Sequence, residues 1–559
     1  MMKALKILLK ITGWTLGILL LLCLVFGIYV YNIATFPHPQ VQRNDSMENL
    51  ERTALNDSTF AIGNNWLTKN EFGHYVMYTE GSAYERGLAN GKLSRELISR
   101  QEEAFTHQIK KMIPSEKYLG FLKYITGFIN RGLPENVTEE YKEEIYGIAL
   151  ASSDSFDWIG DKYTRQMHYH AAHDIGHALQ NMMLVGCTSF GVWGKSTANG
   201  EMIVGRNFDF WVGDEFAEHK IISFVKPEHG YPFAFITWGA FTGVSSGMNA
   251  KGLTVTINAA KSSIPFNAAT PVSLVAREIL QYAATIDEAV AIARKRTMFV
   301  SESFLVSAAA DGKAVVIEKT PSELDIYDAH KDRILCANHF QGPILGNESL
   351  NLEQKATSAS VYRYSRLEQL MPDTVALTVT DAAGILRDTR GINNTEIGLG
   401  NEKALNQLIA HHSVIFKPES LLMWVSTEPW QLGTYVCYDL RKIFSGDFRP
   451  GDTVVRYALN IPADTAFINS LAFRNFLKYR EQKEIFVYGN RAAFDPVSSI
   501  RYNPYFYDAY RMAGDYFLER KEYDKAAKYY KEALDREVAT EGEQKNIQKR
   551  LNKALRKGT

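Results

Sequence analysis

The sequence predicts an α+β protein in which a strand-rich domain follows a helical segment. Three observations lead to this prediction. Residues 11–34 carry no charge, apolar residues recur every three to four positions over about 82–180, and short β-branched runs separated by turn residues fill much of 201–440. Helical and strand-rich stretches are separate along the chain, so an alternating, parallel α/β sheet is not expected.

Length and composition are those of a globular protein with several domains. The 559 residues exceed what one hydrophobic core usually organises. A hydrophobic content of 46% and a charged content of 22% exclude a disordered chain. The formal net charge is -1 and no polybasic tract is present, so we expect no nucleic-acid partner.

Residues 1–34 are predicted to form a cytoplasmic tip and a membrane anchor. The 24 uncharged residues of 11–34 are long enough, at about 1.5 Å per residue, to cross a hydrocarbon layer of roughly 30 Å. Lys3, Lys6 and Lys10 precede them and favour a cytoplasmic amino terminus. We therefore expect a single-pass cell membrane protein whose main domain is extracytoplasmic, and periplasmic in a bacterium. A cleaved signal peptide is the alternative.

The remainder of the chain divides by composition into a polar spacer, a helical segment, a strand-rich domain with two helices inserted, and a helical tail. These parts are expected at 35–60, 61–186, 187–465 (inserted helices at about 273–283 and 286–296) and 466–559.

The helical tail contains one hairpin with tetratricopeptide-like spacing. The residues at the matching positions are Gly514, Phe517, Tyr523, Ala526, Tyr530 and Ala533. A single repeat cannot bury its own apolar face. We expect the hairpin to pack on the main domain, and binding of a protein partner is the alternative.

Four histidines in "MHYHAAHDIGH" form a candidate metal site. They are His168, His170, His173 and His177, and the last two stand at the i, i+4 spacing that zinc sites use. Asp174 stands where a zinc protease motif has glutamate. We favour packing of these histidines against the neighbouring domain and expect no metal or other cofactor. A zinc-dependent hydrolase built on His173 and His177 is the alternative.

Three cysteines lie outside the predicted anchor, namely Cys187, Cys336 and Cys437. An odd number in an oxidising compartment leaves one reactive thiol. Cys336 and Cys437 lie in strand-like runs and could pair or be buried separately. Cys187 instead stands in "MLVGCTSFGVWG", at the junction of the helical and strand-rich stretches.

A cut between Gly186 and Cys187 would give the cysteine a base of its own. A free thiol, with a pKa of about 8.5, is mostly protonated at neutral pH, whereas a new α-amine, with a pKa near 8, could take the thiol proton. Glycine before the cysteine allows strained backbone and leaves its carbonyl open to the thiol. The sequence therefore makes Cys187 a candidate amino-terminal nucleophile.

Two pairs of polar residues downstream could complete this site. Arg206 and Asp209 occur in "VGRNFDF". The aspartate could hold the new amine, and the arginine could fix the aspartate or bind an anionic substrate group. Asn258 and Asn338 end apolar strands, where an uncharged amide donor suits an oxyanion hole.

Several segments resemble the autoproteolytic acyltransferase and amidohydrolase family typified by acyl-coenzyme A:6-aminopenicillanic acid acyltransferase. They are "GCTSFGVWG", "GRNFDF", "GMNAKGLTVTINAA", "AAADGKAVVIEKT", "CANHF", "SVYRYSRLEQL" and "HHSVIFKPESLLMWVS". More distantly the chain is similar to choloylglycine hydrolases and acid ceramidase-like amidases, which are also amino-terminal-nucleophile (Ntn) hydrolases. The upstream "GSAYERGLANGKL" resembles the family's pro-segment, so the resemblance covers about 81–440.

The resemblance implies a four-layer αββα sandwich made of two antiparallel sheets. It also implies a precursor that cuts itself before its nucleophile, with 61–186 as the pro-segment. By motif position the implied catalytic residues are Cys187 as nucleophile, Arg206 and Asp209 as the supporting pair, Asn258 and Asn338 as oxyanion donors, and Arg363, preferred to Arg366, as the residue that orients the site.

We therefore expect a membrane-anchored, extracytoplasmic cysteine amidase for linear amides, or an N-acyltransferase, with a small acyl-amide substrate. Hydrolysis is favoured because coenzyme A thioesters are not expected outside the cytoplasm. Aromatic residues indicate an apolar acyl or aryl group, namely Phe190, Trp193, Phe208, Phe210, Trp211 and Trp238. The alternatives are the zinc hydrolase and a non-enzymatic envelope adaptor that uses the helical tail.

Overall fold

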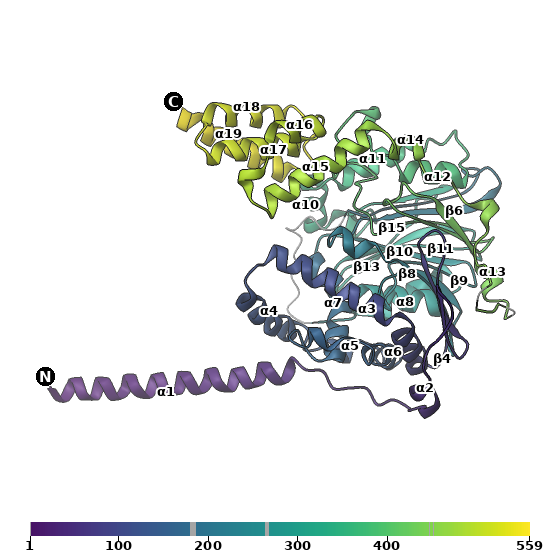
Figure 1. The fold of residues 1–559 in the computed structure, drawn as a ribbon, viewed down its shortest axis with the longest axis horizontal. Coiled ribbons are helices and arrows are strands. Elements are labelled where there is room, and N and C mark those ends of the chain that lie inside the picture. The colour runs from purple at the N-terminus through teal and green to yellow at the C-terminus, as the bar shows by residue number, and fades with distance from the viewer. Residues whose placement is uncertain (1, 179–185, 263–267, 447, 451, 559) are drawn as a thin grey trace.

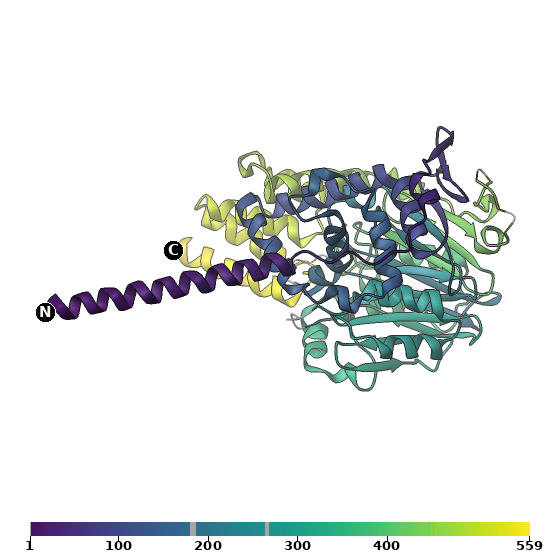
Figure 2. The same ribbon diagram turned by 90° about the horizontal axis from the view of Figure 1, so that it is seen from below.

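The computed structural model describes residues 2–178, 186–262, 268–446, 448–450 and 452–558. A long amino-terminal helix projects from a body of two sheets and their covering helices, and a helical region follows at the carboxyl end (Figure 1). Both chain ends lie on the same side of the body in the two views (Figures 1 and 2). The predicted α+β class, the apolar amino-terminal helix and the helical carboxyl-terminal region are confirmed.

The larger sheet has 11 strands in the order β1-β2-β3-β4-β7-β8-β9-β10-β11-β12-β13. These strands are β1 (Thr53–Asn56), β2 (Thr59–Ile62), β3 (Asn65–Lys69), β4 (Tyr75–Gly81), β7 (Ile221–Pro227), β8 (Phe233–Thr237), β9 (Ser246–Asn249), β10 (Leu253–Ala259), β11 (Glu302–Ala308), β12 (Lys313–Lys319) and β13 (Leu324–Tyr327).

The smaller sheet has six antiparallel strands in the order β14-β5-β6-β15-β16-β17. They are β5 (Thr188–Gly194), β6 (Gly200–Phe208), β14 (Arg333–Cys336), β15 (His412–Lys417), β16 (Leu422–Ser426) and β17 (Tyr435–Asp439).

The α-helices of the described chain run from the amino-terminal rod to the carboxyl-terminal tail. They are α1 (Met2–Ile33), α2 (Asp45–Asn49), α3 (Ala83–Met112), α4 (Glu116–Ile129), α5 (Leu133–Asn136), α6 (Glu139–Ala149), α7 (Lys162–Ala178), α8 (Val272–Tyr282), α9 (Ile286–Lys295), α10 (Ser349–Thr357), α11 (Ser360–Leu370), α12 (Val379–Leu386), α13 (Leu440–Ile443), α14 (Thr465–Ile468), α15 (Leu471–Val487), α16 (Pro496–Tyr502), α17 (Tyr507–Glu519), α18 (Tyr523–Leu534) and α19 (Glu541–Gly558).

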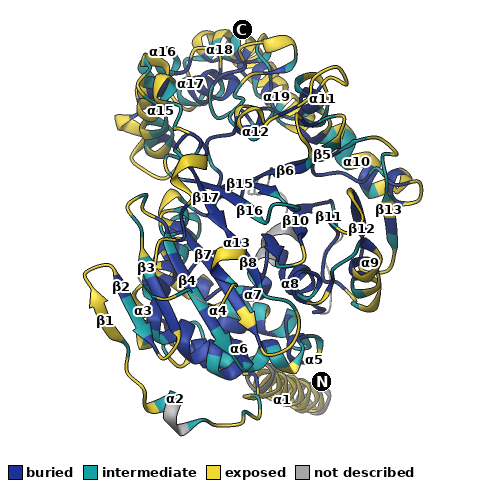
Figure 3. Cartoon of the chain, turned by 90° about the vertical axis from the view of Figure 1, so that its right-hand side faces the viewer, coloured by how far each residue is buried: buried dark blue, intermediate teal, exposed yellow. Residues whose placement is uncertain are grey.

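The two sheets stack face to face around a shared apolar core. Phe224 and Val316 of the larger sheet pack in one cluster with Val414 and Val436 of the smaller sheet. Since side chains alternate along a strand, each sheet also has an opposite face that needs a cover. Helices α6, α7, α8 and α9 cover the larger sheet, and α11 and α12 cover the smaller one. Figure 3 shows the buried strands between these more exposed layers.

Four strands occupy 53–81, where the sequence analysis placed a spacer and the start of an all-helical segment. This part of that prediction was wrong. The segments are short, but "TFAI", "NWLTK" and "YVMYTEG" carry the β-branched and aromatic residues of strands and are separated by turns. They form a stable structure because β4 pairs with β7 of the main sheet, Tyr75 opposite Ile221. This pair is parallel, so the larger sheet is not antiparallel throughout.

Helices α3 and α6 approach each other closely at two glycines. A Cβ on Gly87 would clash with the backbone oxygen of Glu144, and one on Gly147 would lie 2.7 Å from the backbone oxygen of Tyr84. Any larger side chain at either position would force the helices apart. The contact therefore fixes α6, and with it Glu144, against α3.

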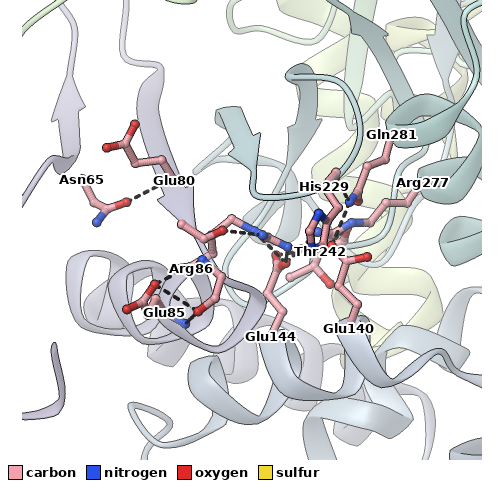
Figure 4. Close-up of polar contacts among 12 residues, drawn as sticks. Asn65, Glu80, Glu85, Arg86, Glu140, Glu144, His229, Thr242, Arg277 and Gln281 are labelled. Atoms are coloured by element: carbon pink, nitrogen blue, oxygen red, sulfur yellow. Dashed lines mark hydrogen bonds and ion pairs between the residues drawn. The ribbon is translucent and has the colours of Figure 1, made fainter. Parts of the chain in front are cut away.

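A buried ionic cluster joins the helices on the outer face of the larger sheet (Figure 4). Glu144 of α6 accepts hydrogen bonds from Arg86 of α3 at 2.8 Å and from Arg277 of α8 at 2.6 Å. Both arginines are at most 1% exposed. The two guanidinium groups hold the pKa of Glu144 at about 2, against the cost of its burial. The cluster ties residues before Cys187 to residues after it.

The helical tail packs on the main domain. Helices α17 and α18 form the expected hairpin, and the Tyr530 ring lies 2.6 Å from where a Cβ on Gly514 would be. Leu408 and Leu432 of the main domain belong to the same apolar cluster as the tail helices. Asn401 also donates a hydrogen bond to the backbone oxygen of Glu537 at 2.9 Å.

Candidate active site

Cys187 lies immediately before Thr188, the first residue of β5. Its side chain is 1% exposed and packs in a cluster with Phe208, Phe210 and Trp238. Antiparallel pairing sets Thr188 of β5 opposite Asn207 of β6, so Arg206 and Asp209 flank the start of β5. The sequence spacing between the cysteine and the R-x-x-D motif is thus the length of one hairpin.

The peptide bond between Gly186 and Cys187 is held from several directions. The carbonyl oxygen of Gly186 accepts hydrogen bonds from Arg363 Nη1 at 2.7 Å and from Gln407 Nε2 at 2.8 Å. The N–H of Gly186 donates to the backbone oxygen of Asp209 at 3.0 Å. Arg363 Nη1 also contacts the carbonyl oxygen of Cys187 at 2.7 Å. Two donors on one carbonyl oxygen polarise it and stabilise negative charge there.

Arg206 contacts the sulfur of Cys187 rather than the carboxylate of Asp209. Its Nη2 lies 3.5 Å from Cys187 Sγ, and its Nη1 donates to Ser246 Oγ at 2.7 Å. The guanidinium also lies over the Phe208 ring, 4.2 Å from the centroid. The arginine therefore directs its donors to sulfur, hydroxyl and backbone oxygen. The sequence left two roles open for Arg206, and the structure does not show the one in which it fixes Asp209.

A chain of hydrogen bonds supports Arg206 from behind. An arginine only donates, so Ser246 Oγ accepts a hydrogen bond from it. The serine hydroxyl can then donate its own hydrogen bond to His412 Nε2 at 2.9 Å. His412 then carries a proton on Nδ1 and donates it to His411 Nδ1, also at 2.9 Å. Burial keeps the pKa of both imidazoles well below the ordinary value, so both are neutral near neutral pH.

The intact chain keeps the thiol protonated and one carboxyl close to half-ionised at neutral pH. Burial raises the pKa of Cys187 to about 11, although Arg206 opposes the shift. Burial also raises the pKa of Asp209 to about 7. Asp209 Oδ2 accepts from Gln407 at 3.3 Å, and Oδ1 is buried without a hydrogen-bond partner among the described residues.

Asn258 and Asn338 lie at the site, but their amide groups are engaged with other partners in this uncut chain. Asn258 Oδ1 accepts from Ser189, and its Nδ2 donates to the backbone oxygen of Cys336 at 3.4 Å. Asn338 Nδ2 donates to the backbone oxygen of Ala259 at 2.8 Å, and its Oδ1 accepts from Arg363. Each Nδ2 carries a second hydrogen that could serve an oxyanion.

Of the two candidate arginines on α11, the structure places Arg363 against the Gly186–Cys187 peptide. Arg366 pairs instead with Asp388 at 2.8 Å. The two residues are three positions apart on one helix, so the sequence alone could not separate them by face.

The aromatic residues named from the sequence do not all gather at Cys187. Phe208, Phe210 and Trp238 share its cluster, whereas Phe190 packs under α11 and α12, Trp193 packs at the core between the sheets, and the Trp211 indole donates to Asp214. A cavity of about 40 Å³ lies beside the cluster, lined by residues of α3, α7 and the loops after β6 and β8, among them Gln166, Phe216, Trp238 and Phe241.

Two of the four histidines in the candidate metal motif have other partners. His170 stacks on Phe241 and contacts Thr242, and His168 bonds to Asn130. The side chains of His173 and His177 lie outside the described residues. Within the residues that the structure describes, no group of three or more His, Cys, Asp and Glu could hold a metal ion.

The two cysteines that the sequence left open to pair or to be buried separately are both free thiols. Cys336 and Cys437 are buried and do not bond to each other. Cys336 lies in the core between the sheets and Cys437 in the core under α11 and α12.

Four residues of the site were not predicted from the sequence, namely Ser246, Gln407, His411 and His412. Gln407 lies in an irregular loop without periodicity, so no pattern marks it. The two histidines stand in "HHSVIFK", which carried the family resemblance, but adjacent residues of a strand point to opposite faces and gave no hint of a shared network. Only their position at the start of β15, where His412 pairs with Phe208 at the end of β6, could have drawn attention to them.

Comparison with known proteins finds a family match over most of the strand-rich domain. Residues 196–426 match the family described as "Acyl-coenzyme A:6-aminopenicillanic acid acyl-transferase". The match begins after Cys187, so it does not test the role predicted for that cysteine. An uncharacterized protein of Archaeoglobus fulgidus is 24% identical over 399 residues, 64% of this chain and 65% of that protein. Protein dcd1B of Dictyostelium discoideum is 24% identical over 229 residues, 38% of this chain and 44% of that protein.

The chain thus spans about two thirds of the length of the Archaeoglobus fulgidus protein and less than half of the length of dcd1B. Among solved structures, a Caenorhabditis elegans ortholog of N-acylethanolamine-hydrolyzing acid amidase superposes with a TM-score of 0.30 and 20% identity over 42% of this chain and 93% of its own. A mutant of conjugated bile acid hydrolase from Clostridium perfringens superposes with a TM-score of 0.31 and 14% identity. The match covers 46% of this chain and 93% of the hydrolase. TM-scores this low support no conclusion about activity.

The two stacked sheets with helices on their outer faces, together with the matched region, define this protein as an α+β protein that resembles an acyl-transferase family through its strand-rich domain. The resemblance drawn from the sequence is confirmed for residues 196–426, which match the model of the acyl-coenzyme A:6-aminopenicillanic acid acyl-transferase family.

Proposed function

We propose that this protein is a self-cleaving cysteine amidase or N-acyltransferase that acts on linear amides through Cys187. The observation that carries the proposal is the pair of donors, Arg363 and Gln407, on the carbonyl oxygen of Gly186, directly before a cysteine whose sulfur faces Arg206. The stacked sheets with helices on both outer faces support the same assignment, because they match the αββα sandwich expected for Ntn hydrolases.

Self-cleavage follows from this arrangement as an acyl shift and a hydrolysis. The sulfur of Cys187 bonds to the carbonyl carbon of Gly186, and Arg363 and Gln407 hold the resulting oxyanion. The C–N bond then breaks, and the proton lost by the thiol ends on the nitrogen, which becomes the α-amine of Cys187. Water cleaves the thioester, leaving a carboxylate on Gly186 and a free thiol.

Turnover uses the same groups on an external amide. The new α-amine takes the thiol proton, the sulfur attacks the substrate carbonyl, and the second amide hydrogens of Asn258 and Asn338 stabilise the oxyanion. The α-ammonium returns the proton to the leaving nitrogen. Water, or an acceptor amine, then releases the acyl group from sulfur. The aromatic cluster beside Cys187 suits an apolar acyl group.

We propose that α1 anchors the enzyme in a membrane with its catalytic body outside the cytoplasm. Residues Leu9–Tyr29 are apolar enough to cross a bilayer, and none of this stretch is buried against the body. A helix of this composition near the amino terminus also fits a signal sequence. Flotation of the full chain with vesicles separates the two, because only a retained anchor carries the chain with the lipid.

Substrate assays test the amidase directly. The purified chain should hydrolyse some members of a panel of N-acyl amino acids, bile-acid conjugates and lipid amides, with Cys187 trapped as a thioester by a slow substrate and found by peptide mass. A chain that turns over none of them, and whose Cys187 resists small thiol electrophiles, would contradict the proposal and favour the non-enzymatic adaptor.

Self-cleavage should accelerate as pH rises through about 7. The pKa of Asp209 lies near this value, and its carboxylate, formed above it, is close enough to act on the thiol electrostatically and could accept its proton transiently. Precursor purified at low pH and shifted to buffers between about pH 5 and 9 should show a rising cleavage rate on denaturing gels. Asp209→Asn should flatten the profile. An unchanged profile in this variant would show that another group titrates.

Replacement of Ser246 should slow self-cleavage by about tenfold, because Arg206 loses a buried charged hydrogen bond of about 1.5–3 kcal/mol and with it a fixed position beside the sulfur. Ser246→Thr keeps the hydroxyl and should restore most of the rate. Both variants are compared by the fraction of precursor remaining over time. Equal rates in Ser246→Ala and the wild type would remove this serine from the account.

A further inference from the structure

Helix α4 exposes an apolar face that no part of the described chain covers. Tyr118 is 51% exposed, Phe121 57%, Tyr124 37% and Ile125 38%. Tyr118, Phe121 and Ile125 follow each other at intervals of three and four residues, so they lie on one side of the helix. Contiguous apolar patches of this kind mark binding surfaces on soluble domains.

The carboxyl-terminal end of α4 packs against the apolar amino-terminal helix. The ring of Phe128 lies 6.5 Å from the ring of Phe26 in α1. A Cβ on Gly127 would lie 2.7 Å from the Cβ of Ala34, so only glycine allows this approach. Figure 1 shows α4 beside the end of α1 that joins the body.

The position of Phe26 fixes the depth of this contact. Phe26 lies three residues before the end of the apolar stretch Leu9–Tyr29. At about 1.5 Å per residue it is within about 5 Å of that end. If the stretch spans a bilayer, the part of α4 that contacts Phe26 must lie at the boundary between acyl chains and headgroups.

The residue types around α4 are those of a membrane interface. Tyrosine and tryptophan concentrate at this level of a bilayer, and Trp158, which is 41% exposed, lies next to the helix. Lys123 donates to the backbone oxygen of Trp158 at 3.0 Å and lies 5.1 Å from the ring centre of Tyr124.

We propose that α4 lies in the outer interface of the membrane, with Tyr118, Phe121, Tyr124 and Ile125 in contact with lipid. The proposal rests on the proposed anchoring by α1. The bilayer is favoured over a protein partner because the apolar face of α4 continues the apolar surface of α1. Attachment through both helices fixes the orientation of the catalytic body, which α1 alone would leave free to turn.

The test places a fluorescent unnatural amino acid at position 121 of the full chain and, in a control chain, at position 344. Ile344 is 63% exposed and lies in a loop of the main domain remote in sequence from α4. Both chains are reconstituted in vesicles of phosphatidylethanolamine and phosphatidylglycerol. Flotation then measures anchoring, and quenching by shallow doxyl lipids or by aqueous iodide measures the depth of each fluorophore.

We expect the chains to float with the vesicles, and lipid quenching at position 121 to exceed that at 344 severalfold, with iodide showing the reverse. Flotation with equal, iodide-only quenching at both positions would overturn the placement of α4 and leave the anchor intact. A chain that does not float would overturn both. None of these outcomes depends on amidase activity, which the substrate panel tests separately.

Discussion

Cys187→Ala should abolish both self-cleavage and turnover, leaving a single uncut chain. In the proposed mechanism the sulfur bonds to the reacting carbonyl in both reactions, so its loss should reduce turnover by at least about 10⁴-fold. Cleavage is read from denaturing gels and turnover from the best substrate of the panel.

A matched control separates loss of this thiol from loss of any buried thiol. Cys437→Ala removes a sulfur that is equally buried, but in the core under α11 and α12. It should cut itself and turn over at close to the wild-type rates. Activity retained by Cys187→Ala, or lost equally in both variants, would remove Cys187 from its assigned role.

Glu144→Ala should cause the largest loss of stability among the substitutions considered, about 3–5 kcal/mol. It leaves Arg86 and Arg277 buried without their shared carboxylate, and an unpaired buried charge is costly. The measurement is the free energy of unfolding from denaturant titration of the Cys187→Ala precursor, so that cleavage does not complicate it. Glu139→Ala removes an exposed carboxylate of the same helix and should change stability by under about 1 kcal/mol.

The pH dependence of Glu144 gives the same prediction an independent check. Its folded pKa of about 2 lies below the ordinary 4.5, so the carboxylate stabilises the fold above pH 4.5. This contribution is lost as pH falls from about 4.5 through 2. The stability difference between wild type and Glu144→Ala should therefore shrink in acid. A difference independent of pH would mean that the side chain acts through packing alone.

The ionic cluster also predicts what happens after cleavage. Glu144 lies before the proposed cut and Arg277 after it, and strand β4 pairs with β7 across the same boundary. The two fragments should therefore remain together through purification and separate only in denaturant.

Much of the main domain could be predicted from sequence because its strands are long and strongly patterned. Residues 253–259 and 302–319 alternate or run apolar between clear turns, and the inserted helices α8 and α9 show the 3.6-residue period. Strands β1 to β3 could not be predicted because each has only four or five residues, and β4 lies between them and a long helical pattern. Their conformation depends on pairing with β7, a contact between residues about 150 positions apart.

The candidate site also contains some residues that the sequence could predict and others that it could not. Cys187, Arg206 and Asp209 could be proposed from their spacing, since one hairpin brings them together. Gln407 could not, because a loop that is irregular in sequence carries it back to Gly186. The sequence left Asp209 open as a partner of Arg206, but the arginine contacts the sulfur of Cys187. The orientation of a side chain at a strand end depends on the opposite sheet, which here contributes Ser246.

The most direct test of the account is the first residue of the large fragment in purified wild-type protein. Intact mass and amino-terminal sequencing should find two polypeptides that remain bound to each other, the larger beginning with Cys187. An uncut wild-type chain that hydrolyses amides at full rate, or a fragment that begins at any other residue, would show that the nucleophile does not gain its amine in the way described.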